Sequence, residues 1–320
     1  MRQHIKGLFD PYILALLGTV ALASLFPARG IWVGIFDTAA DAGIILLFFL
    51  HGAKLSREAI LAGAGAWRLH LAVLGATFLL FPALGLGISA IPGLPAVVAT
   101  GMLFLTLLPS TVQSSIAFTA IARGNVAAAV CSASFSNLLG IFVTPLLAAL
   151  LLGNGGASIS LSSVEKILLQ LLLPFVIGHL MRPLLAGFLA RNKSIIGYVD
   201  RGSILLIVYT AFGAAVVEGL WRQMPPATIL LIAILSAVLL AIVLLVTRFA
   251  GRLLGLSRED SIVLLFCGSK KSLASGVPMA GVLFPAAIVG QIILPLMLFH
   301  QLQLIACALI ARRMGAQAEV

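Results

Sequence analysis

Long apolar runs alternate with short polar or Gly- and Pro-containing connections along almost the whole chain. Most runs are near 20 residues, the length that an α-helix needs to cross the hydrocarbon core of a bilayer. They lack the period-two alternation of apolar and polar residues that a transmembrane β-strand requires. The pattern therefore predicts an all-α membrane protein. About ten transmembrane helices are expected, at residues 11–28, 38–53, 69–91, 97–121, 126–152, 167–189, 203–220, 227–247, 261–284 and 287–311.

The composition agrees with a membrane location. Of the 320 residues, 61% are hydrophobic and 9% are charged, and the mean hydropathy of +1.18 is far above that of a water-soluble domain. The net charge of +10 comes from basic residues scattered singly between apolar runs, without the basic face of a nucleic-acid-binding protein. The three cysteines lie inside apolar runs without CxxC spacing, so no disulfide framework or zinc site is indicated. We expect the lipid bilayer and a small-molecule solute as partners, with no nucleic acid and no cofactor other than a possible sodium ion.

The distribution of lysine and arginine predicts the orientation of the helices. If both termini are cytoplasmic, 15 of the 20 basic residues lie on the cytoplasmic side and three, Arg29, Lys166 and Arg222, lie outside. This excess follows the positive-inside rule and indicates a multi-pass protein of the cytoplasmic (inner) membrane. Arg2 and Lys6, ahead of the first apolar run, are also compatible with a signal peptide, so both interpretations of that segment stay open.

A Gly/Ser-rich linker at residues 153–166 separates a first half, 1–152, from a second half, 167–320, with five predicted helices each. An odd number of helices inverts the second half in the membrane. Polar, interrupted helices recur at matching places, as "LTLLPSTVQSSIAFT" in the fourth helix and "VLLFCGSKKSLASG" in the ninth. Inverted repeats with one broken helix in each half are typical of secondary transporters, whose sites lie beside the breaks. We therefore expect two inverted five-helix repeats with broken, crossing fourth and ninth helices.

Lys270 and Lys271 lie in the middle of an apolar run, where each lysine costs roughly 2.5–3.5 kcal/mol at the bilayer centre. Either they face a protein-lined site, or they extend from a helix end to the interface. No Asp or Glu falls in the central part of any predicted helix to neutralise them. In a site, such a lysine can act as an ammonium that occupies a cation site or as a counter-charge for an anionic substrate. The substrate or coupling-ion site is predicted at Gln113, Ser114, Ser115, Cys267, Ser269, Lys270, Lys271 and Ser272, with Thr77, Ser132, Asn137, His179 and His300 as weaker candidates.

Three motifs indicate a family: "ARGNVA" at 122–127, "LFFLHGAKLSREAI" at 47–60 and "FCGSKKSLASGVPMA" at 266–280. With them the chain resembles the bile acid:sodium symporter family, and within it the subgroup of sodium/bile acid cotransporter 7-like proteins and their bacterial counterparts. The resemblance covers essentially the whole chain. It implies a ten-helix fold with a panel domain against a core domain, and two sodium sites beside the crossing fourth and ninth helices.

The sodium ligands that the resemblance implies are mostly replaced. The family's ligating acid falls on Cys267 and its nearby glutamine ligand on Lys271. Two hydroxyl ligands fall on Ala129 and Ala133, and the glutamine of the third helix falls on Thr77. We therefore expect weak or absent dependence on sodium, with protons as the alternative coupling ion.

The sequence thus predicts a secondary active transporter, a sodium- or proton-coupled symporter that carries an organic anion such as a bile-acid-like solute by alternating access. A membrane regulator that keeps the transporter fold without transporting is one alternative. An intramembrane hydrolase is another, because Lys271 and Ser275 share a helix face at i,i+4. No oxyanion arrangement accompanies that pair, so we expect no enzyme. The sequence does not indicate the substrate's identity, the direction of transport or the oligomeric state.

Overall fold

The computed structural model describes residues 11–54, 65–152 and 168–317. Within these ranges the chain forms helices joined by short connections and contains no strand, so the all-α prediction is confirmed there. The predicted linker at 153–166 and the termini predicted to be cytoplasmic lie outside the described residues.

Helices that could cross a membrane dominate the structure. In the described part of the chain, seven are long and apolar enough on their own. Two further apolar helices, Leu14–Leu25 and Ala96–Leu107, are shorter. The protein is therefore a multi-pass membrane protein, whereas the count of ten spans and the inverted repeat stay predictions. The seven spans are Ile31–Lys54, Trp67–Ser89, Val126–Leu152, Leu169–Arg191, Lys193–Val217, Pro226–Leu253 and Ala286–Ala316.

The chain folds into two compact units, and each draws on both sequence halves. The first unit comprises Met1–Leu55, Ala157–Pro225 and Val277–Gln291, and the second comprises Ser56–Gly156, Pro226–Gly276 and Ile292–Val320. These two compact units are not the two predicted five-helix repeats, and their existence does not test the repeats. Helix α16 (Leu273–Leu283) begins in the second unit and ends in the first, whereas α17 (Ala286–Ala316) begins in the first and ends in the second.

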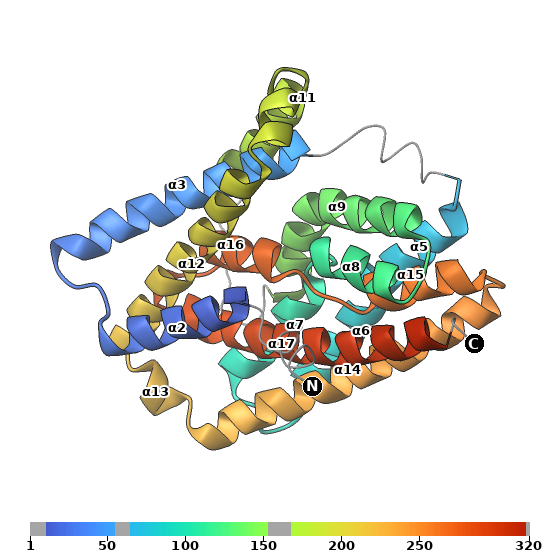
Figure 1. The fold of residues 1–320 in the computed structure, drawn as a ribbon. Helices are drawn as coiled ribbons and strands as arrows, with labels where there is room; N and C mark the ends of the chain where they lie inside the picture. The colour runs from blue at the N-terminus through green and yellow to red at the C-terminus, as the bar shows by residue number, and fades with distance from the viewer. Residues whose placement is uncertain (1–10, 55–64, 153–167, 318–320) are drawn as a thin grey trace. The chain divides into compact units, whose positions relative to one another are not determined.

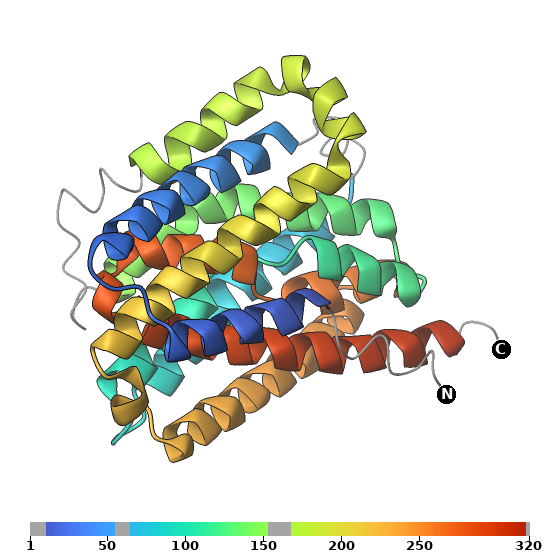
Figure 2. The same ribbon diagram turned by 60° about the vertical axis from the view of Figure 1, so that its left-hand side comes forward.

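The first unit contains α3 (Ile31–Lys54) and α11 (Leu173–Arg191), which lie side by side in Figures 1 and 2. A Cβ atom on Gly52 would come within 2.0 Å of the Phe175 carbonyl oxygen, and one on Gly178 within 2.0 Å of that of Phe49. The two backbones therefore touch directly, as is common between membrane helices that meet through small residues. The unit also contains α2 (Pro11–Leu25), η2 (Leu168–Leu172), α12 (Lys193–Val217) and α13 (Leu220–Gln223).

Two predicted helix starts in the first unit are wrong. Helix α12 begins at Lys193 rather than at residue 203, and α3 begins at Ile31 rather than at residue 38. Each predicted segment was made to begin just after a charged residue, Asp37 or Arg201. A helix can nevertheless include charged residues when they are paired or exposed. Asp200, on the early part of α12, forms an ion pair with Lys54 at the end of α3.

The second unit contains two non-helical segments, at the places where the broken helices were predicted. In Figure 1, α8 (Gln113–Ile121) lies beside α9 (Val126–Leu152) and α15 (Arg258–Gly268). The chain leaves the helix between α7 (Ala96–Leu107) and α8, and again between α15 and α16. That α7 and α8 together form one membrane span, and α15 and α16 another, stays a prediction. The remaining elements of this unit are α5 (Trp67–Gly75), η1 (Ala76–Leu80), α6 (Phe81–Ser89) and α14 (Pro226–Leu253).

The motif "ARGN" makes the turn from α8 to α9. Arg123 has a φ of 57°, which lets the chain reverse after α8. A Cβ atom on Gly124 would lie 2.6 Å from Ile262 of α15, so only glycine fits there. The side chain of Asn125 accepts a hydrogen bond from Ala128 N at the start of α9 and donates to Asp260 Oδ1 at 2.9 Å. The motif therefore caps α9 and fastens it to the beginning of α15.

Candidate functional site

The chain leaves the helix between Leu107, the last residue of α7, and Gln113, the first residue of α8. Pro109 lies in this gap, and it has no backbone N–H and disrupts helical continuation. A backbone carbonyl that is buried without a partner is costly, so each one in the gap needs a donor. Every carbonyl oxygen from residue 106 to 110 accepts a hydrogen bond from another element. The donors are Lys271 Nζ to Thr106 (2.7 Å) and Leu108 (2.6 Å), Thr144 Oγ1 to Leu107 (2.7 Å), Ser272 N to Pro109 (2.9 Å) and Asn137 Nδ2 to Ser110 (2.6 Å).

The second gap lies between Gly268, where α15 ends, and Leu273, where α16 begins. The last carbonyl groups of α15 are capped by hydroxyl groups rather than by a continuing helix. The donors are Ser269 to Leu265, Ser115 to Phe266 (3.1 Å) and Ser110 to Cys267 (2.6 Å). Because Ser110 and the Pro109–Ser272 hydrogen bond connect both gaps, the two non-helical segments hold each other in place.

Lys271 is fully buried, with 0% of its surface exposed. Besides Thr106 and Leu108, its ammonium donates to the carbonyl oxygen of Thr77 at 2.8 Å. That carbonyl is open because η1 is π-helical: the N–H of Phe81 bonds to Ala76, and Pro82 has no N–H to offer. All three N–H donors of the ammonium are thus used by main-chain oxygens.

The backbone of Lys271 is held by one side chain of α17. Its N–H donates to Gln303 Oε1 at 2.9 Å, and its carbonyl accepts from Gln303 Nε2 at 3.0 Å. Gln303 Nε2 also lies 2.8 Å from His300 Nδ1. Gln303 is fully buried, so it replaces for Lys271 the backbone partners that a continuous helix would have supplied.

Lys270 is equally buried but has a different environment. Its Nζ lies 3.9 Å from the ring centroid of Phe118 and 5.3 Å from that of Phe266. It finds no hydrogen-bond partner among the described residues, and neither does the hydroxyl of Ser114, one helical turn before Phe118 on α8. Two aromatic faces stabilise a desolvated ammonium by about 2 kcal/mol or more, but they leave its three N–H donors unused.

No carboxylate neutralises this pair of lysines within the described residues of the second unit. The only acidic residues there are Glu259 and Asp260, both in the first turn of α15. Lys270 follows the opposite end of that helix, ten residues after Asp260, and Asp260 itself bonds to Asn125. The candidate site is therefore a buried pair of lysines surrounded almost entirely by main-chain oxygens, hydroxyls and aromatic rings.

All of the predicted site residues except His179 fall in the second unit, and His179 lies on α11 of the first unit. Asn137 is well placed between the gaps, because it donates to Ser110 O and accepts from Ser275 Oγ at 3.0 Å. Gln113 is exposed at the first position of α8. The other positions are as follows: Ser132 pairs with His70 Nδ1 (2.8 Å), Ser272 Oγ donates to Ser275 Oγ (3.0 Å), Cys267 Sγ lies 3.8 Å from Ala129 O, and Thr77 Oγ1 donates to Val73 O (2.8 Å).

Both lysines are enclosed by protein, so the alternative in which they extend from a helix end to the interface does not describe this structure. Nor do they contact the same elements: Lys271 contacts η1, the end of α7 and the Phe81 ring of α6 at 4.2 Å, whereas Lys270 contacts α8 and α15. The backbone between Gly268 and Leu273 is not helical, and this allows two consecutive side chains to enter different parts of the unit.

The sequence-based prediction missed Gln303, Thr144 and the aromatic rings around the lysines. Gln303 was detectable in "LFHQLQL" as a second amide beyond His300 in an apolar run. Thr144 and Phe118 gave no signal, because a lone threonine or phenylalanine in a membrane helix is ordinary. Their roles depend on which distant segment each one faces.

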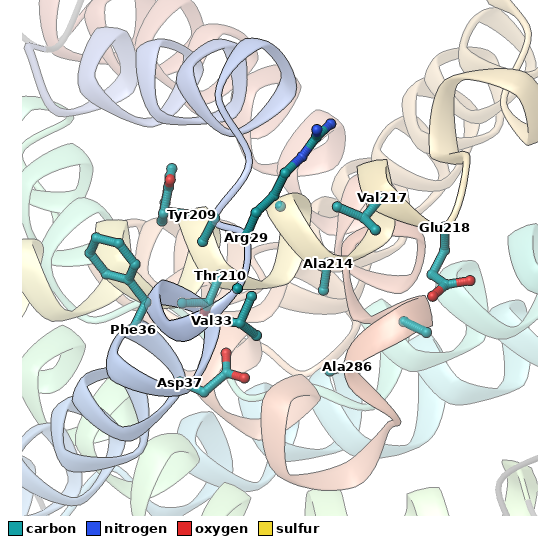
Figure 3. Close-up of a pocket in the computed structure, with 14 residues that line it drawn as sticks. Arg29, Val33, Phe36, Asp37, Tyr209, Thr210, Ala214, Val217, Glu218 and Ala286 are labelled. Carbon is teal, nitrogen blue, oxygen red and sulfur yellow. The ribbon is translucent and has the colours of Figure 1, made fainter.

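The first unit holds a pocket of about 400 Å³. Its walls are formed by α3, the end of α12, the start of α17 and the connection between α2 and α3. Figure 3 shows Arg29, Asp37 and Glu218 around it, with Asp37 and Glu218 on opposite sides. The rest of the lining is largely apolar, with Tyr209 and Thr210 adding hydroxyls. None of the predicted site residues is among the described residues that line this pocket.

Comparisons with known proteins give a consistent answer. The profile of the SBF-like CPA transporter family matches residues 10–316. The chain is 54% identical to "Putative symporter YfeH" of Escherichia coli (strain K12) over 314 residues, which is 98% of this chain and 95% of that protein. It is also 54% identical to "Uncharacterized protein PA2026" of Pseudomonas aeruginosa, over 95% of this chain and 92% of that protein. Sodium/bile acid cotransporter 7 of Mus musculus is 28% identical, over 95% of this chain and 92% of that protein.

Proposed function

The chain belongs to the SBF-like CPA transporter family, and we propose that it is a secondary active transporter that carries an organic anion by alternating access around the two non-helical gaps. The observation that supports the anionic substrate is the buried Lys270, whose ammonium has no hydrogen-bond partner among the described residues. The relatives named as sodium/bile acid cotransporters make a bile-acid-like solute the first candidate.

In this proposal Lys270 supplies the counter-charge for the anionic group of the substrate. A buried ammonium is costly unless something compensates its charge. The rings of Phe118 and Phe266 compensate it partly while the site is closed. An anion that enters when the site opens would use the three idle N–H donors, and the hydroxyl of Ser114 offers one more. The substrate would therefore be bound most strongly through its charged end.

The hydrolase alternative has little support from the geometry. A Ser–Lys dyad needs the amine of the lysine beside the hydroxyl of the serine. The ammonium of Lys271 instead uses its donors on three carbonyl groups, and Ser275 Oγ donates to Asn137 Oδ1. The regulator alternative, a transporter fold that does not transport, is decided by measuring flux.

The test is uptake into proteoliposomes reconstituted with the purified protein. Radiolabelled taurocholate serves as the bile-acid probe, alongside a panel of other organic mono- and dianions. We expect uptake above that of protein-free vesicles for at least one anion. For that anion, Lys270→Gln should lower the initial rate about tenfold or more, since losing a charge-assisted contact of about 1.4 kcal/mol is a factor of ten.

Arg252→Gln is the matched control, because it removes one positive charge from an exposed position at the end of α14. Its uptake rate should stay within twofold of the wild type. If no anion in the panel is taken up, the regulator alternative is favoured. If Lys270→Gln transports as fast as the wild type, Lys270 does not contact the substrate.

A further inference from the structure

The surroundings of Lys271 have the chemistry of a cation-binding site. Three main-chain carbonyl oxygens, from Thr77, Thr106 and Leu108, converge on its Nζ at 2.8, 2.7 and 2.6 Å. These are the short distances of charge-assisted hydrogen bonds. Rings of carbonyl oxygens are also what proteins use to replace the hydration shell of a monovalent cation in a membrane.

The local backbone structure leaves these oxygens without the N–H donors that a continuous α-helix would give them. The Thr77 carbonyl is released by the π-helical segment η1 and by Pro82. The other two lie at the end of α7, whose C-terminal dipole favours positive charge. The N–H of Ser110, four residues after Thr106, bonds to Ser136 Oγ instead of continuing the helix. Without a cation, three buried acceptors would be left without donors at this point.

We propose that Lys271 is a tethered cation, whose ammonium permanently occupies a monovalent-cation site formed by the carbonyl groups of Thr77, Thr106 and Leu108. The site itself rests on geometry alone. Its consequence for coupling rests on the proposed function: a cation that is covalently attached cannot be exchanged with the solution, so no sodium ion fills this position during transport.

The proposal also separates the roles of the two lysines. Since all three N–H donors of Lys271 are in use, an anion could gain a hydrogen bond from it only by breaking one of the three present. Lys270 has its donors available. Lys271 thus organises the two gaps, and Lys270 is left to contact the substrate.

The test is to remove the side chain of Lys271 and to measure whether a free monovalent cation then binds at the site. Purified Lys271→Ala is melted in detergent in 150 mM sodium, lithium or ammonium chloride, with choline chloride as the reference, because choline is too large for the site. We expect its melting temperature in choline to fall below that of the wild type. Ammonium or sodium should then raise it saturably by roughly 3 °C or more, which is the effect of a ligand present well above its Kd.

Two matched variants define the control. Lys271→Met fills the same space without charge or donors, so its melting temperature should not respond to the salts. Lys270→Ala removes an equally buried lysine whose Nζ has no hydrogen-bond partner among the described residues, so it too should not respond. A melting temperature of Lys271→Ala that is the same in all four salts would overturn the proposal, as would an equal response of all three variants.

The wild type provides a measurement that needs no variant, in case Lys271→Ala does not fold. Its melting temperature should be the same in sodium and in choline, since the site is already filled. A saturable stabilisation of the wild type by sodium would refute the tethered cation. This outcome is distinct from failure of the proposed function, because the melting experiment requires no substrate and no transport.

Discussion

Replacing Gly140 by alanine tests whether the gap between α7 and α8 is held as tightly as the structure indicates. Gly140 lies on α9 and faces Pro109. A Cβ atom at position 140 would lie 2.6 Å from Cβ and 2.8 Å from Cγ of Pro109, whereas ordinary contacts are 3.4–4 Å. The proline ring cannot rotate away, so either α9 or the gap segment has to move by about 1 Å.

The cost follows from what that movement breaks. The gap is fixed by hydrogen bonds of 2.6–2.9 Å, including Thr144 Oγ1 to Leu107 O and Ser272 N to Pro109 O. A displacement of about 1 Å lengthens one or two of them beyond 3.5 Å, at about 0.5–1.5 kcal/mol each. Overpacking adds about 1–3 kcal/mol, and the better helix propensity of alanine returns about 0.5–1 kcal/mol. We expect a net destabilisation of about 2–3 kcal/mol.

The assay is thermal unfolding of the purified protein in detergent, for which 2–3 kcal/mol corresponds to a drop of about 4–8 °C. Gly87→Ala on α6 is the control, because among the described residues no atom lies within 4 Å of its added Cβ. It should melt at or slightly above the wild-type temperature. If Gly140→Ala melts as high as Gly87→Ala, α9 and Pro109 are not in close contact and the gap is not rigid.

Two further predictions concern the support of Lys271 and the orientation of the chain. Gln303→Leu should lower the melting temperature by several degrees, because it leaves the buried N–H and C=O of Lys271 without partners at about 1–3 kcal/mol each; Gln303→Glu, which keeps an acceptor for the N–H, should cost less. Single cysteines introduced at Ser158 and Ser194 should react differently with an impermeant maleimide in intact cells, with Ser158→Cys labelled and Ser194→Cys protected. Labelling of Ser194→Cys from outside would reverse the predicted topology. The native cysteines are fully buried and should add little background.

The sequence alone determined the features that depend on composition and local pattern. Apolar runs near 20 residues predicted an all-helical membrane protein, and Pro109 and the "GSKKS" stretch predicted where the chain leaves the helix. The motifs indicated the family, which the match over residues 10–316 confirms. These features can be predicted because a membrane helix makes its backbone hydrogen bonds within its own segment. The length of the segment, its hydropathy and its helix-breaking residues are therefore visible in the local sequence.

The sequence did not determine what each lysine contacts. It predicted that Lys271 carries function, with Lys270 next, and it left open whether such a lysine occupies a cation site or is the counter-charge of an anionic substrate. In the tertiary structure the acceptors of Lys271 come from residues 163 to 194 positions away. Both ammonium groups lie near aromatic rings, but that of Lys270 has no hydrogen-bond acceptor among the described residues.

The reason is that both gaps release backbone groups whose partners lie in other segments. Gln303 and Thr144 became part of the site only because α17 and α9 pass beside the gaps. A lone polar residue in an apolar run looks the same whether it bonds within its own helix or caps a distant break. Periodicity records the side of a helix that a residue occupies, but only the packing of the helices decides which open carbonyl or ammonium that side meets.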